Sequence, residues 1–192
     1  MSILKDYPPF NGDTFLCEEF LSLKQKHEID TAVETGTFMG STTLWLSNNF
    51  QHVHTTEIKK EHYEGAMLNL QGAGNITFWN QGSIDALPEI LRQCTNKTII
   101  FLDAHWYENP LLKELEIIAG SGLKPIIAIH DFKNPNRPEY GYDVYPDQKI
   151  VYEWKWIESR VNAIYGEGNF NHYYNDKAIG AKRGCVFIVP KN

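Results

Sequence analysis

Short apolar runs alternate with amphipathic stretches along most of this 192-residue chain. Stretches that we expect to form strands lie at 31–34, 52–58, 75–79, 98–102 and 125–129, and those at 98–102 and 125–129 are continuously apolar but for Thr98 and Pro125. Stretches with helical spacing of apolar residues lie at 14–26, 60–71, 110–119 and 150–165, and two more helices are expected to begin after Gly40 and at Ser83. Five strands that alternate with helices predict an α/β fold, a doubly wound parallel sheet with right-handed crossovers.

The last part of the chain breaks this alternation. Runs at 170–174 and 185–189 follow one another without a helix, which predicts an antiparallel hairpin at the end of the sheet. Segment 133–149 carries several prolines and three tyrosines; we interpret it as a substrate lid, with a slack connector as the alternative. Residues 1–12 are expected to form an arm, and the whole chain, 1–192, a single domain.

Stretch 31–46 has the order that a nucleotide-type cofactor needs: a short strand, a glycine-bearing turn and the start of a helix. Gly36 and Gly40 suit a sharp turn and a close backbone approach, and backbone amides at such a helix start favour a polar or anionic ligand. Phe38 stands where a dinucleotide fingerprint has its middle glycine, which argues against a pyrophosphate on this loop. A plain strand-to-helix turn is the alternative.

Polar side chains gather where the predicted strands end. Glu57 closes the second strand roughly 20 residues past the glycine turn, where a carboxylate can accept hydrogen bonds from both ribose hydroxyls; a solvated acid is the alternative. In doubly wound sheets, ligands bind beyond the carboxyl ends of the strands. The candidate site therefore consists of the polar residues at these ends: Glu34, Glu57, Ser83, Asp103, His105, His130 and Asp131.

Composition excludes several classes of function. A net charge of -6, with no basic run beyond Lys59-Lys60, argues against nucleic acid as a partner. The three cysteines are widely spaced and form no Cys-x-x-Cys pair, which predicts reduced thiols and no zinc cluster. The amino terminus lacks the apolar core of a signal peptide, and no stretch reaches about 18 apolar residues. We therefore expect a soluble, cytoplasmic protein without a membrane partner.

The chain resembles the class I S-adenosylmethionine-dependent methyltransferases from about Asp13 to Pro190. The resemblance lies in Glu-Thr-Gly-Thr-Phe-Met-Gly-Ser-Thr at 34–42, Leu-Asp-Ala-His-Trp at 102–106 and His-Asp-Phe at 130–132. It is greatest to the branch of sugar and macrolide O-methyltransferases and cephalosporin-hydroxylase-like proteins. The resemblance implies a Rossmann-like, mostly parallel seven-stranded sheet and methyl transfer from S-adenosylmethionine to a small-molecule acceptor, with a hydroxyl of a sugar or natural product favoured.

The resemblance also implies roles for the residues of the cofactor site. Glu34, Gly36 and Gly40 are expected to hold the methionine end of S-adenosylmethionine, and Glu57 its ribose. Gly82 and Ser83 are expected to border the adenine. The other expected cofactor-binding residues are Thr37, Phe38, Ser41, Thr42 and Asp103.

In metal-dependent members of that branch, acids at the ends of the fourth and fifth strands hold magnesium. Asp103 and Asp131 match those places, whereas His130 stands where a further acid is often found. Because Mg²⁺ prefers oxygen ligands, three alternatives stay open: Mg²⁺, another divalent ion, or no metal.

Methyl transfer to a hydroxyl requires in-line positioning and removal of the acceptor's proton. We expect His105, His130 and Asp131 to be the catalytic residues, with the two histidines as candidate bases. A metal hydrolase built on these residues and Asp103 is an alternative, but it leaves the glycine loop unexplained. A nucleotide-dependent oxidoreductase and a cofactor-binding module without turnover are further alternatives for the function. The sequence also leaves the oligomeric state open, a homo-oligomer included.

Overall fold

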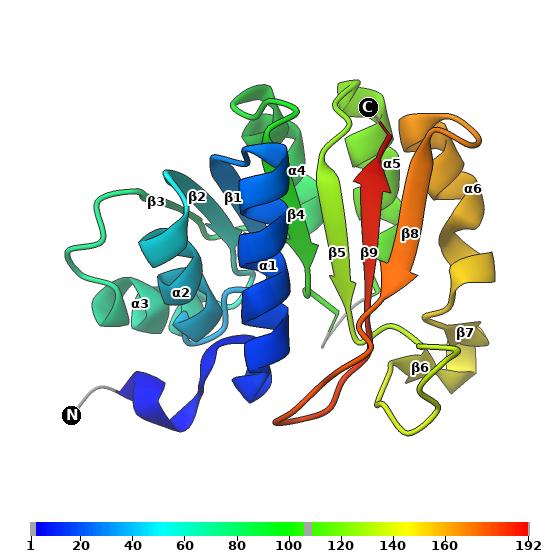
Figure 1. The fold of residues 1–192 in the computed structure, drawn as a ribbon. Coiled ribbons are helices and arrows are strands. Elements are labelled where there is room, and N and C mark those ends of the chain that lie inside the picture. The colour runs from blue at the N-terminus through cyan, green and yellow to red at the C-terminus, as the bar shows by residue number, and fades with distance from the viewer. Residues whose placement is uncertain (1–2, 106–108, 192) are drawn as a thin grey trace.

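The computed structural model describes residues 3–105 and 109–191. Its central sheet has seven strands in the order β3-β2-β1-β4-β5-β9-β8 (Figure 1). The strands are β1 (Thr31–Thr35), β2 (His52–Thr56), β3 (Ile76–Trp79), β4 (Thr98–Leu102), β5 (Ile126–His130), β8 (Phe170–Tyr174) and β9 (Cys185–Pro190). The first five are parallel, and β9 runs antiparallel to both β5 and β8. The predicted fold class, including the hairpin, is confirmed.

Six α-helices cover this sheet in the described part of the chain. They are α1 (Thr14–His27), α2 (Ser41–Asn49), α3 (Lys60–Asn69), α4 (Ser83–Arg92), α5 (Leu111–Ser121) and α6 (Trp154–Tyr165). Asp13 caps α1, because its carboxylate accepts hydrogen bonds from the amides of Phe15 and Leu16. Short 3₁₀ helices lie at Ile3–Asp6, Pro9–Gly12 and Pro146–Gln148.

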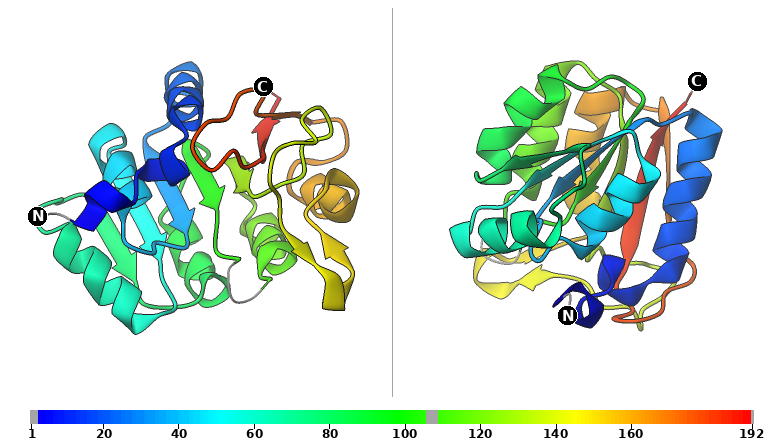
Figure 2. Two further views of the ribbon diagram at one scale, coloured as in Figure 1. Left: turned by 90° about the horizontal axis from the view of Figure 1, so that it is seen from below. Right: turned by 90° about the vertical axis from the view of Figure 1, so that its left-hand side faces the viewer.

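The apolar strands are buried on both faces. Along β4, Ile99 and Phe101 pack with residues of α1 and α2, whereas Ile100 and Leu102 pack with residues of α4, α5 and α6. Successive side chains of a strand point to opposite faces, so an uninterrupted apolar run is what a strand between two helical layers requires. The view along the sheet shows α1 and α2 on one side and α4 on the other (Figure 2, right).

The prediction of a helix from 150 to 165 is wrong at its beginning. Ile150–Val151 forms strand β7, which pairs antiparallel with β6 (Val144–Tyr145), and α6 begins only at Trp154. Lys149 has a left-handed backbone, with φ 56°, and the Tyr152 amide donates to the Asp143 carbonyl. The pairing of β6 with β7 therefore engages backbone amides and carbonyls that a helix beginning at Ile150 would need for its own hydrogen bonds.

Three segments meet at the edge formed by the carboxyl ends of β1 to β5: residues 3–12, 133–149 and 175–184 (Figure 2, left). Phe10 is buried, and its ring contacts the rings of Phe20, Trp45 and Phe101. The expected arm is therefore packed against the core at this point.

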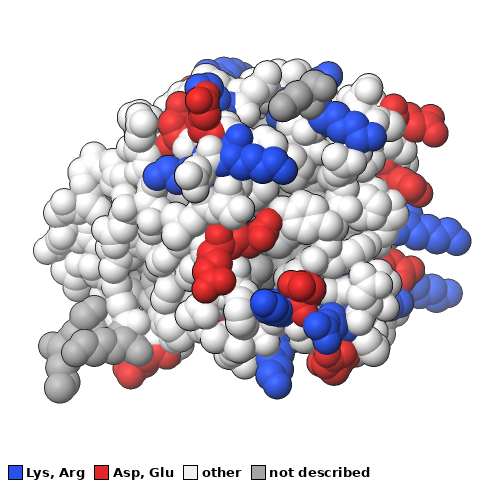
Figure 3. Space-filling view, viewed as in Figure 1, with Lys and Arg blue, Asp and Glu red and all other residues white. Residues whose placement is uncertain are grey.

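None of the helices in the described residues is long and apolar enough to cross a membrane. Acidic and basic side chains are interspersed on the face drawn in Figure 3, and the residues described there form no extended basic patch.

Candidate active site

The glycine turn joins β1 to α2 and lies against the end of β4. Gly36 has φ +91°, and a Cβ on it would lie 2.7 Å from the Asp103 carbonyl oxygen. The amides of Gly36 and Thr37 both donate to the Thr56 carbonyl at 3.0 Å. Gly40, with φ +88°, precedes α2, and a Cβ there would lie 2.9 Å from Leu70 Cδ1. Both positions therefore require glycine for conformation and for space.

Phe38 adopts the left-handed conformation that a glycine would adopt more easily, with φ 49°. Its amide donates to Glu57 Oε2 at 2.9 Å. Its ring lies edge-on to those of Tyr7 and His62, with centroid distances of 5.2 and 4.9 Å. The aromatic residue thus ties the turn to the end of β2 and to the amino-terminal segment.

Glu57 follows β2 and is held by backbone amides. Besides the Phe38 amide, the Lys59 amide donates to it, to Oε1 at 2.8 Å. Each carboxylate oxygen has a further lone pair that a ligand hydroxyl can use. The next residue, Ile58, is 54% exposed, and a Cβ on Gly82 would lie 3.5 Å from its Cδ1. Ile58 was not singled out in the sequence, and its signal is an exposed apolar residue directly after a strand-end acid.

Three of the residues expected to contact the cofactor have side chains that are directed to other protein groups. The carboxylate of Glu34 is buried beneath the turn and accepts the Thr43 and Thr55 hydroxyls at 2.5 and 2.7 Å; burial raises its pKa to about 8. Thr42 Oγ1 accepts the Phe10 amide at 3.0 Å. Ser83 is buried beside the carboxyl of Glu114. These three side chains therefore hold neighbouring parts of the site together by hydrogen bonds inside the protein.

Two further expected residues lie at the turn. Thr37 is also buried and directed inward, with its Oγ1 2.6 Å from Thr55 Oγ1. Ser41 Oγ is buried and has no hydrogen-bond partner among the described residues. A buried hydroxyl without a partner, at the start of α2, is free to bind a polar ligand group.

Two histidines and two aspartates at the ends of β4 and β5 form a closed ring of polar atoms. His105 Nε2 lies 2.9 Å from Asp131 Oδ2 and 3.6 Å from Asp103 Oδ1. His130 Nδ1 lies 3.1 Å from Asp103 Oδ1 and 3.4 Å from Asp131 Oδ2. The sequence placed all four residues at one edge, and the structure brings them into contact. Trp106, which carried part of the resemblance, lies outside the described residues.

The ring is also an electrostatic unit. Burial disfavours the charged form of both imidazoles, but the neighbouring carboxylates outweigh it and raise the pKa of His105 and, more strongly, of His130. Burial by itself raises the pKa of Asp131, but His130, His105 and Arg183 hold it well below its usual value. The two histidines and Asp131 therefore stabilise one another's charged forms.

Arg183 and Asp143 belong to this site, although no sequence motif indicated them. Arg183, from the loop before β9, donates through Nε to Asp131 Oδ1 and through Nη2 to Asp143 Oδ1, the latter at 2.5 Å. A hollow of about 520 Å³ opens beside them. Its lining is Asn11, His105, Asp131, Asp143, Val144, Tyr145, Ala181 and Arg183. Segment 133–149 thus supplies part of this wall, and its movement as a lid stays a prediction.

The ring can also accommodate a metal ion. Asp103, His105 and Asp131 each offer one ligand atom, and these atoms lie within 4.8 Å of one another. Two carboxylate oxygens and an imidazole nitrogen are a donor set that fits a divalent ion.

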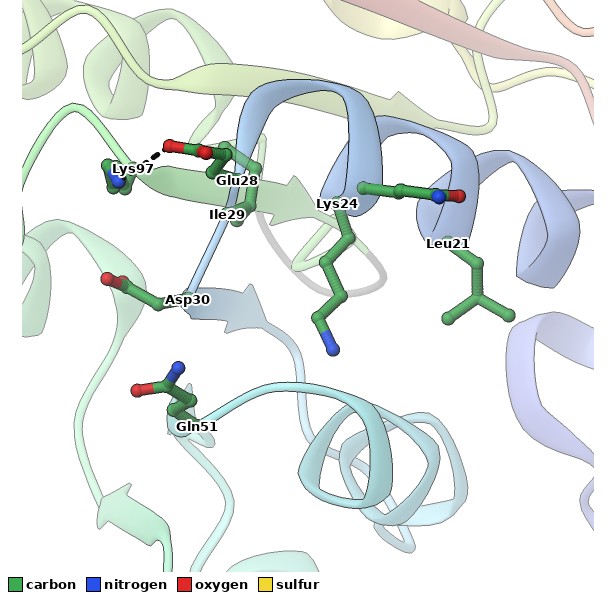
Figure 4. A pocket seen from close by; sticks show the side chains of 8 residues that line it. Leu21, Lys24, Glu28, Ile29, Asp30, Gln51 and Lys97 are labelled. Carbon is green, nitrogen blue, oxygen red and sulfur yellow. Dashed lines mark hydrogen bonds and ion pairs between the residues drawn. The ribbon is translucent and has the colours of Figure 1, made fainter.

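A larger hollow of about 650 Å³ lies at the opposite edge of the sheet, between the end of α1 and the starts of β1 and β2 (Figure 4). Lys97 pairs with Glu28 across it at 3.0 Å, and Lys24 and Asp30 also line it. It faces the amino ends of the strands, far from the turn and the ring, so it is not part of the candidate site.

No protein-family model matches the chain, and no curated protein matches it in sequence. Solved structures do match. An O-methyltransferase from Bacillus cereus in complex with S-adenosylhomocysteine (SAH) superposes with a TM-score of 0.66 at 20% identity, over 97% of this chain and 86% of that one. TomG from Streptomyces achromogenes, an O-methyltransferase of tomaymycin synthesis in complex with S-adenosylmethionine (SAM), gives 0.61 at 16% identity, over 91% and 79%.

Precorrin 8W decarboxylase from Methanobacterium thermoautotrophicum gives a TM-score of 0.53 at 18% identity, over 89% of each chain. These identities are too low to transfer an activity, and the shared property is the arrangement of the sheet and its helices. The chain therefore has the Rossmann-like fold of the class I S-adenosylmethionine-dependent methyltransferases.

Proposed function

We propose that the protein transfers a methyl group from SAM to a hydroxyl of a small molecule. The contact between Gly36 and Asp103 carries this proposal. It puts the turn suited to a cofactor directly against a residue of the His–Asp ring, with 2.7 Å between a Cβ on Gly36 and the Asp103 carbonyl oxygen. A methyl donor on the turn and an acceptor in the hollow would then be neighbours, as in-line transfer requires.

The cofactor's parts fit different residues of this edge. Glu57 is suited to the ribose hydroxyls, because its oxygens face amides on one side and keep lone pairs for a ligand. Ile58 and Gly82 offer an apolar surface for the adenine. The turn from Gly36 to Gly40 and the Ser41 hydroxyl are suited to the methionine end, while Glu34 supports the turn from beneath.

The reaction breaks the bond between sulfur and the methyl carbon and forms a bond between that carbon and the acceptor oxygen. The electron pair of the broken bond stays on sulfur, and the hydroxyl proton must leave. Only the neutral form of an imidazole can take this proton. His105, which lines the hollow, and His130 behind it are placed to do so, with Asp131 orienting them, and their raised pKa values shift this neutral form to higher pH. A divalent ion held by Asp103 and Asp131 would instead supply Lewis acidity to the hydroxyl.

Calorimetry and a transfer assay test the proposal. We expect the purified protein to bind SAH saturably at one site and not to bind NAD. A panel of diols, sugars and phenols with labelled SAM should then identify an acceptor by label transfer. Binding of NAD without binding of SAH would refute the proposal; SAH binding without transfer to any acceptor would favour a non-catalytic cofactor-binding module. Cytoplasmic location remains a prediction from the sequence, which leaves the oligomeric state open.

A further inference from the structure

We propose that Asn11 is a specificity-determining residue, whose side-chain amide binds a neutral polar group of the methyl acceptor in the hollow beside Arg183. We call this hollow the acceptor hollow. The proposal deepens the proposed function and rests on it, because it concerns how the acceptor is recognised. It describes the acceptor as a neutral molecule that has a second polar group besides the hydroxyl that is methylated.

Asn11 lies where the amino-terminal segment meets the loop before β9 (Figure 2, left). The preceding residue, Phe10, is 2% exposed, and its amide donates to Thr42 Oγ1 at 3.0 Å. The Asn11 carbonyl accepts the Ala181 amide at 3.3 Å, and Gly180 leaves no space for a side chain beside that carbonyl. The backbone of Asn11 is therefore fixed between the start of α2 and this loop, and both Asn11 and Ala181 line the acceptor hollow.

The backbone around Asn11 has an unusual conformation. Phe10, Asn11 and Gly12 are all left-handed, with φ 50°, 54° and 83°. Residues other than glycine rarely adopt this conformation, although asparagine adopts it more readily than most. It persists where the surroundings impose it, and such residues cluster at functional sites. Here the turn buries Phe10 and leaves the next side chain, that of Asn11, exposed at the hollow.

Asn11 differs from the other polar residues of the acceptor hollow in having a side chain without a partner. Each of the others is bonded to another residue of the wall: His105, Asp131, Asp143, Tyr145 and Arg183. Within the described part of the chain, the Asn11 side chain makes no hydrogen bond. An acceptor can therefore bind to Asn11 without breaking an interaction inside the protein, whereas binding to the other side chains competes with existing bonds.

The pairing of the charged residues favours a neutral acceptor. Arg183 is the one lysine or arginine among the described residues that line the hollow, and it is shared by Asp131 and Asp143. A carboxylate or phosphate on the acceptor would have to displace one of these acids from the guanidinium. The amide of Asn11 instead offers two donor hydrogens and an acceptor oxygen without a charge, which suits a hydroxyl or carbonyl group. Val144, which is 47% exposed, adds an apolar surface to the hollow.

Nitrogen-15 NMR of the whole protein tests the proposal without methyl transfer. The side-chain amide signal of Asn11 is assigned by its loss in Asn11→Gly, because glycine keeps the left-handed backbone. The probes are the panel of diols, sugars and phenols, together with neutral hexosides and their matching hexuronic acids, each titrated with and without SAH. We expect every probe that shifts the backbone amides of Tyr145 and Ala181 to shift the Asn11 side-chain amide as well. A neutral hexoside should bind at least about threefold more tightly than its hexuronic acid.

Three results would overturn the proposal. They are shifts at Tyr145 and Ala181 without a shift of the Asn11 side chain, equal or tighter binding of the hexuronic acids, and the absence of shifts at the hollow with every probe. SAH titration and label transfer test the proposed function separately. Failure of SAH to bind refutes that function, whereas the contact with Asn11 is measured from the NMR shifts alone.

The affinity of the variants measures what the Asn11 side chain contributes. In Asn11→Gly, the affinity for the most tightly bound neutral probe should fall about three- to tenfold, the effect of losing a hydrogen bond. Glu28→Gly is the matched control, because Glu28 is also exposed and left-handed, with φ 51°, but lies at the opposite edge of the sheet. Its affinity for the same probe should equal that of the wild type.

Unchanged probe affinity in folded Asn11→Gly contradicts the proposal. If Asn11→Gly fails to fold, Asn11→Asp replaces it for the assignment, because aspartate also tolerates a left-handed backbone and lacks the side-chain amide signal. The shift of the Asn11 signal in the wild type then decides between contact with the acceptor and no contact.

Discussion

Gly36 lies directly against the backbone of Asp103: a Cβ at residue 36 would lie 2.7 Å from the Asp103 carbonyl oxygen and 3.1 Å from its carbonyl carbon. The turn that is proposed to hold the cofactor and the strand end that carries the His–Asp ring are therefore packed backbone against backbone, with no space for a side chain between them.

Replacement of Gly36 tests this relationship. Gly36→Ala should destabilise the fold by about 1 to 3 kcal/mol, because alanine is strained at φ +91° and its Cβ collides with β4. SAH affinity, measured by calorimetry, should fall at least about tenfold. The control is Gly120→Ala in α5, where a Cβ meets nothing within 4 Å and stability should be equal or higher. Wild-type affinity in folded Gly36→Ala would refute the assignment of the turn.

Glu57 should contribute to SAH affinity rather than to stability alone. Glu57→Ala removes a carboxylate that accepts two backbone amides and is proposed to accept the ribose, so SAH binding should weaken by about 1 to 3 kcal/mol. Glu64→Ala, which removes an exposed partner of Lys60, is the control and should bind SAH normally. A lower melting temperature with unchanged SAH affinity would make Glu57 a purely structural acid.

Glu34 should make the protein less stable as the pH rises. Its pKa is about 8 in the folded protein against an ordinary 4.5, because burial disfavours its charge. Between about pH 4.5 and pH 8 the unfolded chain therefore releases this proton while the folded protein keeps it, and the free energy of unfolding falls. The loss should reach about 3 kcal/mol between pH 5 and pH 8.

Urea unfolding of the wild type and of Glu34→Gln measures this effect. Glutamine cannot titrate, so the difference in unfolding free energy between Glu34→Gln and the wild type should change with pH in favour of the variant. Glu64→Gln, at an exposed position, should follow the wild-type curve. A pH dependence identical in Glu34→Gln and the wild type would show that the carboxylate is solvated in the folded protein.

Arg183 should hold segment 133–149 in place where this segment lines the acceptor hollow. Arg183→Ala leaves Asp131 and Asp143 without their shared cation, so stability should fall by about 3 kcal/mol and amide exchange in 133–149 should accelerate. Arg160→Ala, which removes a half-exposed pair with Glu116, should cost less than about 1 kcal/mol. Unchanged exchange in 133–149 would mean that the loop is held by its backbone bonds alone.

Removal of a histidine of the His–Asp ring should lower kcat and leave the affinity for SAH unchanged. Once an acceptor is identified, His105→Ala should lower kcat by about 10² to 10⁴ while SAH affinity stays within about twofold, because removal of the hydroxyl proton contributes only in the transition state. A chelator should abolish the methyl-transfer activity of the wild type if a divalent metal ion is required. Full activity in chelator and in both His105→Ala and His130→Ala would leave the ring without a chemical role.

The amino-acid pattern determined the architecture. Apolar runs such as 98–102, which must be buried on both faces, predict parallel strands between helices, and two strands without a helix predict the hairpin. Parallel strands also align their carboxyl ends, so the sequence placed Asp103, His105, His130 and Asp131 at one edge. The beginning of α6 could not be predicted, because the pairing of β6 with β7 depends on two residues in each strand and leaves no periodic signal.

Only the tertiary structure decided which of these side chains face the ligand space. Glu34, Thr42 and Ser83 have the residue types of a binding site, but in the folded chain they contact other protein groups: the Thr43 hydroxyl, the Phe10 amide and the Glu114 carboxyl. Arg183 and Asp143 come from loops, whose paths follow no hydrophobic period, and they reach Asp131 only when those loops pack together. The periodicity of apolar residues determines the helices and strands and their order, because a whole face of each element must be buried. The direction of a single side chain is set instead by local dihedral angles and by contacts with residues far away in the sequence.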